Sequence, residues 1–171
     1  MTNKEIIKNL QSNNNSIILE TLEIISKEGN SIVLEEVLKL LLSTSDTTVR
    51  DKIILILDNL REPSCVPVIS NAINNPDFEE LLSILVSSCW KNSLNFNDYI
   101  ELFTEVFINS DFQLAFDAFT VIENFDYIEP ELADVCLLKL ENAVENIKDD
   151  KKLLFFELIN VIKQIKENPA N

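Results

Sequence analysis

Five short polar turns divide the chain into segments of similar length, and this spacing constrains the fold more than any other feature of the sequence. Each turn precedes a strongly apolar stretch, and the turns can be marked at Asn15, Asp46, Asp77, Asp111 and Asp149. The intervals between successive marks are 31, 31, 34 and 38 residues. Intervals of this size are typical of helical repeats, in which each unit buries its apolar face against its neighbours.

The segment 46–60, DTTVRDKIILILDNL, shows the pattern most clearly. Asp46 is expected to be the N-cap, because its carboxylate can accept hydrogen bonds from free N–H groups and suits the positive end of the helix dipole. Apolar residues follow at steps of three and four and predict one buried face: Val49, Ile53, Ile56, Leu57 and Leu60. Ile54 and Leu55 widen that face, so we expect this helix to be covered on two sides.

Composition supports an all-α chain with a substantial core. Of its 171 residues 46% are hydrophobic, only one is glycine and five are proline, and no stretch alternates between apolar and polar residues. We expect Gly29 to close a helix over 16–28 in the left-handed conformation. The sequence therefore predicts one helical-repeat domain over 1–171, with units at about 3–28, 31–60, 64–91, 97–125 and 130–166.

Two motifs carry a family resemblance. Residues 46–50, with the pattern Asp-x-x-Val-Arg, resemble the start of the second helix of a HEAT-like repeat, and 65–69 followed by Asn-Pro-Asp at 75–77 resemble the first helix and turn of the next. The resemblance implies an α-α superhelix, a short right-handed solenoid of about five antiparallel helical hairpins of the HEAT/armadillo type. An armadillo-like array and an irregular helical bundle are the alternatives.

Functional chemistry is notable for what the sequence lacks. The chain has no histidine, so histidine triads, bases and metal ligands are excluded, and one glycine cannot build a phosphate-binding loop. Cys65, Cys89 and Cys136 have no zinc-ligand spacing and are expected to be buried thiols. Adjacent carboxylates such as Glu79 and Glu80 point about 100° apart on a helix, which favours a solvated face. We therefore predict no catalytic residue, metal site or cofactor.

The segments at the two ends bear on location. MTNKEIIKNL has no continuous apolar run and is not a secretory signal, and no segment approaches the roughly 20 apolar residues that span a membrane. A soluble, cytoplasmic protein is expected.

The C-terminal helix, predicted over 150–166, should carry Lys151, Lys152, Lys163 and Lys166 on its outer positions as a polar cap.

Charge and aromatic residues gather in the same part of the chain. Residues 62–138 hold 14 acidic residues and one basic residue, Lys91, and ten of the 13 aromatic residues lie between Trp90 and Tyr127. Regular spacing predicts that most of these rings are core, including Phe112 and Phe116. An anionic surface repels nucleic acid and anionic membranes but attracts basic partners.

These features predict a non-enzymatic interaction module that binds a basic protein or peptide. The residues expected to contact the partner are Glu79, Glu80, Trp90, Tyr99, Glu101 and Glu105. Three alternatives are a structural subunit, an acidic immunity or inhibitor protein that blocks a basic enzyme, and an enzyme subunit resembling the HEAT-like bilin lyases.

Overall fold

A computed structural model describes residues 1–28 and 31–168, and within these ranges the chain is all-helical with no strand. The predicted all-α class is confirmed, whereas the role expected of Gly29 falls outside the described residues. The chain divides into two compact units, Met1–Leu94 and Asn95–Asn171, hereafter unit 1 and unit 2. The superhelical arrangement and the single domain stay predictions.

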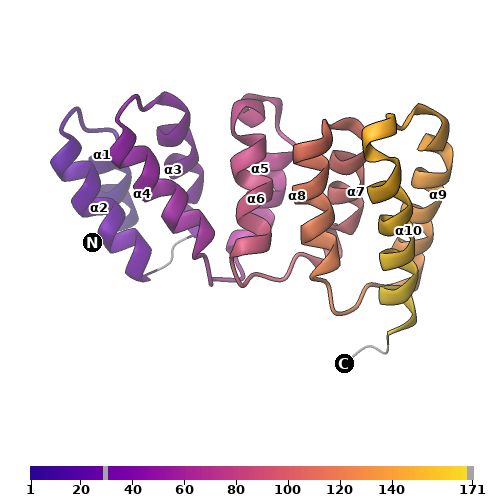
Figure 1. Cartoon of the computed structure of the whole chain (residues 1–171). Coiled ribbons are helices and arrows are strands. Elements are labelled where there is room, and N and C mark those ends of the chain that lie inside the picture. The colour runs from indigo at the N-terminus through magenta and orange to yellow at the C-terminus, as the bar shows by residue number, and fades with distance from the viewer. Residues whose placement is uncertain (29–30, 169–171) are drawn as a thin grey trace. The chain divides into compact units, whose positions relative to one another are not determined.

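Unit 1 contains six α-helices and one 3₁₀ segment in its described part. In chain order they are α1 (Asn3–Leu10), α2 (Asn15–Glu28), α3 (Ser31–Ser43), α4 (Thr47–Asp58), α5 (Cys65–Ile73), η1 (Pro76–Leu81) and α6 (Leu82–Lys91). Paired helices contact each other, and each helix also packs on the helix two further along, so that α1, α3 and α5 form one layer and α2, α4 and α6 the other (Figure 1).

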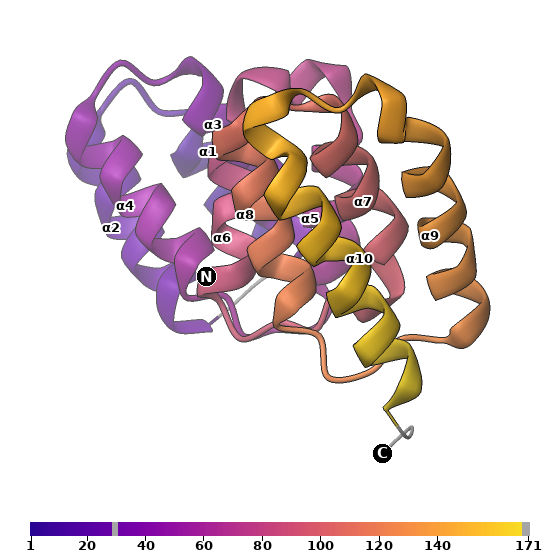
Figure 2. The ribbon, with the colours of Figure 1, turned by 45° about the vertical axis from the view of Figure 1, so that its right-hand side comes forward.

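Unit 2 repeats this arrangement with four α-helices between residues 95 and 168. Its elements are η2 (Asn97–Tyr99), α7 (Ile100–Asn109), α8 (Phe112–Glu123), α9 (Pro130–Ala143), η3 (Val144–Asn146), η4 (Asp149–Lys151) and α10 (Lys152–Glu167). Helix α7 packs on α8 and α9, and α10 packs on α8 and α9. Helices α8 and α10 lie side by side with their N-terminal ends at the same end of the unit (Figures 1 and 2).

Local chemistry explains where several helices begin. The Asp46 carboxylate accepts a hydrogen bond from the Val49 N–H at 2.9 Å, and Asp111 caps α8 by accepting one from the Leu114 N–H at 3.1 Å. Pro130 occupies the first turn of α9, as its fixed φ and missing N–H predict. The other oxygen of Asp46 accepts a hydrogen bond from the Asn15 side chain at 2.6 Å, so one carboxylate links the starts of α2 and α4.

Short 3₁₀ segments that the apolar spacing does not predict lie at several helix ends. The unit predicted over 64–91 contains η1, in which Phe78 departs from helical backbone angles, and α6 begins only at Leu82. Similarly, η2 precedes α7, and η4 precedes α10. Helix α9 ends at Ala143 and is followed directly by η3, which ends at Asn146. Short 3₁₀ turns are common at helix ends and are hard to predict from apolar spacing.

Burial confirms most of the predicted core, with informative exceptions. All five residues predicted for the buried face of α4 are buried, but Leu55 is 55% exposed, so that helix is not covered as widely as expected. Phe112 and Phe116, expected in the core, are exposed, and so is Val144. Conversely, Lys151 was expected on the outer face and is 3% exposed.

Candidate functional site

The six residues predicted to bind a partner are divided between the two units. Glu79 and Glu80 lie in η1 and Trp90 lies in α6, all in unit 1, whereas Tyr99 of η2 and the two glutamates of α7 lie in unit 2. The structure therefore gives two local surfaces, and each is described by itself.

Glu79 and Glu80 form an exposed acidic edge of unit 1. With Asp77 and Pro76 they line a shallow cavity of about 430 Å³ that Leu42 and Ser43 complete. Neither glutamate forms an ion pair with the residues that the structure describes. Both carboxylates are consequently available to a cation.

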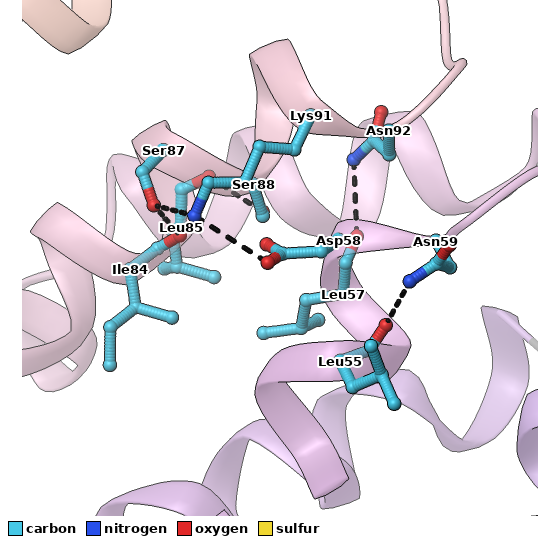
Figure 3. A network of polar contacts seen from close by, with 10 residues as sticks. All are labelled: Leu55, Leu57, Asp58, Asn59, Ile84, Leu85, Ser87, Ser88, Lys91 and Asn92. Carbon is cyan, nitrogen blue, oxygen red and sulfur yellow. Dashed lines mark hydrogen bonds and ion pairs between the residues drawn. The ribbon is translucent and has the colours of Figure 1, made fainter. Parts of the chain in front are cut away.

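Trp90 differs from this edge because a base lies against it. The indole is 39% exposed, and the Lys91 ammonium lies 5.5 Å from its ring centroid in a cation–π contact. Lys91 also donates to the Ser87 hydroxyl at 3.3 Å and pairs with Asp58 at 3.5 Å, while Asn92 donates to the Leu57 carbonyl at 3.3 Å (Figure 3). The network ties α6 to α4 and places positive charge beside the ring, which disfavours Trp90 as a contact for a basic partner.

Glu101 and Glu105 are also engaged within the protein. Lys139 of α9 donates to the Glu101 carboxylate at 2.8 Å and makes a short contact with the Glu105 carboxylate. These hydrogen bonds, with the two negative charges, raise the pKa of Lys139 above its usual value. The shared base neutralises part of the charge, so these two glutamates attract a partner less than an unpaired pair would. Tyr99 is half-buried.

A pair of stacked phenylalanines on α8 presents exposed aromatic surface in unit 2. Phe112 is 44% exposed and Phe116 is 45% exposed, and their ring centroids are 6.3 Å apart with planes inclined by 25°. Phe119 continues the stack at 6.4 Å from Phe116 but is buried. We call Phe112 and Phe116 the α8 aromatic pair.

The four-residue spacing of these large rings predicts a buried stripe, and this prediction is wrong for Phe112 and Phe116, which are exposed. The buried face of α8 instead contains the apolar residues Ala115, Ala118, Phe119, Val121 and Ile122, and the two alanines allow close approach of neighbouring helices. On a helical wheel Phe112 lies at the edge of this face, about 20° from Phe119, and Phe116 lies beyond that edge, about 60° from Phe119. The two alanines were the signal that could have corrected the prediction.

Lys151 stabilises the end of unit 2 at which the α8 aromatic pair lies. Its ammonium donates to three main-chain carbonyls at the end of α7, those of Phe107 (3.0 Å), Ile108 (3.1 Å) and Ser110 (2.7 Å). Burial lowers the pKa of Lys151, and the positive charge of Lys148 lowers it further. Three carbonyl acceptors match the three N–H donors of an ammonium, so the geometry favours the charged form. The lysine caps α7 from another helix.

Exposed apolar residues follow this junction on both α8 and α10. Phe112 follows Ser110 by two residues, and Leu153 follows Lys151 by two residues at the start of α10. Leu153 is 87% exposed, and one turn later Phe156 is 54% exposed. Exposed aromatic and aliphatic side chains therefore accompany the neighbouring N-terminal ends of α8 and α10.

Nucleophiles and metal ligands do not gather at these surfaces. Cys65, Cys89 and Cys136 are free and buried, and burial raises the pKa of each thiol, which keeps it protonated. Among the described residues no group of three acidic or cysteine side chains is placed to hold a metal ion. Within the same residues no helix is long and apolar enough to cross a membrane.

Comparison with known proteins gave no match. No protein-family model matches the sequence, and no curated protein matches it. Among the described residues the chain is an all-helical protein built from packed helix pairs, and its candidate sites are the acidic edge at Glu79 and Glu80 in unit 1 and the α8 aromatic pair in unit 2.

Proposed function

We propose that this chain is a non-enzymatic binding module of HEAT-like helical repeats, working in the cytoplasm, that binds a basic segment of another protein. The observation that carries the proposal is the α8 aromatic pair, two large rings left exposed in a strongly acidic unit. Binding of nucleic acid or an anionic membrane is not part of the proposal, because charge of this sign repels phosphate.

The aromatic pair supplies apolar surface for a partner to cover. Burying a phenylalanine side chain contributes roughly 1.5 to 3 kcal/mol, and aromatic residues are enriched among the residues that dominate interface energies. Phe116 stacks on the buried Phe119 and Phe112 stacks on Phe116, which restricts the motion of both rings before binding. A partner that covers both rings therefore loses little side-chain entropy from this surface.

Charge supports a basic partner. Unit 2 holds 16 acidic and 6 basic residues, a net charge of −10. Three of its bases, Lys139, Lys152 and Lys166, form ion pairs with carboxylates of the same unit, and Lys151 is bound to carbonyls. Exposed Glu123, in the last turn of α8, and exposed Glu157 of α10 remain on the helices that present apolar residues. Such a surface accelerates association with a cationic segment and discriminates against acidic ones.

The residues predicted from sequence take different weights in this proposal. Glu79 and Glu80 stay candidates for contacts with a basic partner, because both are exposed and unpaired within the described chain. Glu101 and Glu105 are secondary, since Lys139 already binds both, and Trp90 is secondary because Lys91 lies over its ring. Tyr99 has no further support.

The test uses synthetic lysine- and arginine-rich peptides that carry apolar residues at helical spacing. Binding is measured by calorimetry at low and moderate salt for the wild type and for Phe112→Ser/Phe116→Ser. The matched control is Val135→Ser/Leu138→Ser, which removes two exposed apolar side chains from α9 in the same unit. We expect salt-sensitive binding that the α8 variant weakens at least tenfold and the α9 variant retains. Equal binding by all three proteins, or none by the wild type, would reject the proposal.

A second candidate, a structural subunit that pairs with its own copies, is favoured by one observation. A groove of about 360 Å³ between α9 and α10 is lined by apolar side chains, including the exposed Val144 and Phe156, with Glu141 and Lys163 also in its lining. Sedimentation of the wild type and of Phe156→Ser tests this candidate. A dimer that the substitution dissociates would favour it, and a monomer at all accessible concentrations would exclude it.

A further inference from the structure

A cavity of about 570 Å³ beside α2 and α4 in unit 1 has the opposite character to the acidic surfaces. Its apolar side is formed by Ile25, Ile56 and Leu60, with the 55% exposed Leu55 at its lining. Its polar side contains three bases, Lys27, Lys52 and Arg61. The volume lies within the range of small-molecule sites, about 300 to 1,000 Å³.

Positive charge at this cavity is only partly neutralised. Glu23, which does not line the cavity, pairs with Lys27 at 3.3 Å and with Lys52, so one carboxylate serves two ammonium groups. The lining carboxylate, Glu62, accepts a hydrogen bond from the Ser64 hydroxyl at 3.2 Å. Arg61 is exposed and pairs with no carboxylate in the described part of the chain.

We propose that this cavity binds a small organic anion with an apolar body, whose charged group contacts Lys52 and Arg61 and whose body lies on Ile56 and Leu60. The guanidinium of Arg61 can bind a carboxylate, sulfonate or phosphate oxygen pair in a fork, and Lys52 supplies a second, partly buried charge. The apolar side of the cavity favours binding of a ligand with an apolar body over binding of an inorganic ion, because it can bury apolar surface of the ligand. This site is independent of the partner-binding function proposed for unit 2.

Glu23 has a defined role in this proposal as the competing internal anion. Hydrogen bonds from Lys52 and then Lys27 lower the pKa of Glu23, so its carboxylate is ionised at neutral pH and holds both lysines. A ligand anion must share Lys52 with it. Replacing this one carboxylate with an amide therefore increases affinity for an anion, although the substitution touches no ligand.

The experiment titrates 1-naphthoate into the ¹⁵N-labelled full chain and follows amide chemical shifts. The neutral isostere 1-naphthamide tests the need for charge, and inorganic phosphate tests the need for the apolar body. We expect saturable shifts for 1-naphthoate at residues 25–27 and 52–62, with weaker binding of both other probes. Glu23→Gln should tighten 1-naphthoate binding about fivefold, the effect of one charge a few ångströms away in a watery setting, and Lys52→Gln should weaken it.

Glu20→Gln is the matched control, because Glu20 is exposed on the same helix and its replacement makes the same change in net charge. The proposal is overturned if Glu23→Gln and Glu20→Gln bind equally, or if 1-naphthamide binds as tightly as 1-naphthoate. Phosphate affinity equal to that of 1-naphthoate would overturn the requirement for an apolar body. Shifts confined to 112–123 would place the ligand on the α8 aromatic pair and also overturn the proposal.

Discussion

Replacing Lys151 with methionine tests the lysine as a cap that holds α10 to the end of α7. Methionine keeps the length and apolar character of the side chain but removes all three hydrogen-bond donors. The carbonyl of Phe107 then becomes an unsatisfied polar group in a buried setting, whereas those of Ile108 and Ser110 are only partly buried and can reach water.

The expected loss of stability follows from these three bonds. A hydrogen bond to a charged group contributes roughly 1.5 to 3 kcal/mol net, and a buried orphaned carbonyl costs about 1 to 3 kcal/mol. Relief of the desolvated ammonium offsets part of this loss. We therefore expect Lys151→Met to lower the free energy of unfolding by about 2 to 4 kcal/mol, measured by urea titration with circular dichroism.

Lys152→Met is the control for this prediction. Lys152 is the next residue, but its side chain is 53% exposed and its ion pair is with Asp149, whose side chain is 94% exposed. Exposed pairs contribute about 0 to 1 kcal/mol, so this variant should stay close to the wild type. If Lys151→Met and Lys152→Met have the same midpoint and slope in urea, the capping argument fails.

Three further predictions concern ionisation and thiol access. In the folded chain the pKa of Glu23 is lowered below its ordinary 4.5, so the stability that its ionised carboxylate contributes is present above pH 4.5 and is lost as pH falls through the lower folded pKa. The difference in unfolding free energy between wild type and Glu23→Gln, measured by urea titration, should therefore shrink from pH 7 to pH 3. A constant difference would contradict this. Lys139→Met should release Glu101 and Glu105 and tighten binding of basic peptides by calorimetry, whereas unchanged or weaker binding would show that these glutamates take no part. The Cys89 thiol, buried and with a raised pKa, should react with a thiol reagent only after unfolding, and fast labelling of the native chain would refute its burial.

The parts of this fold that sequence could predict are those decided by local chemistry. Asp46 and Asp111 cap helices because a short carboxylate before an apolar run has few better places for its oxygens, and Pro130 begins a helix because its φ is fixed. The apolar spacing of α4 likewise identified its buried face, because residues at steps of three and four lie on one side of a helix.

The parts that sequence missed depend on which neighbour covers which face. The aromatic spacing of α8 favoured burial of Phe112 and Phe116, but Ala115 and Ala118 determine the close approach of other helices, and the rings are left outside. Lys151 stands four residues before Phe155 and seven before Leu158, on the buried stripe of α10. The prediction placed Lys151 on the outer face because the side chain is charged. The carbonyl groups that accept its hydrogen bonds belong to the end of α7 and cannot be recognised from the sequence around Lys151.

The shared carboxylate of Asp46 has a consequence for how unit 1 opens. One oxygen caps α4 and the other receives the Asn15 side chain of the preceding repeat, 31 residues away, so fraying of α4 also releases a contact of α2. Ser64 and Ser31, joined at 2.9 Å, make a comparable connection between α3 and the turn before α5. In a nearest-neighbour description of unfolding, such bonds add to the coupling between successive helix pairs more than to the stability of either pair alone. The amides of α2 and α4 should therefore exchange through one common opening reaction. Removing the Asp46 carboxylate should separate this reaction into two independent openings.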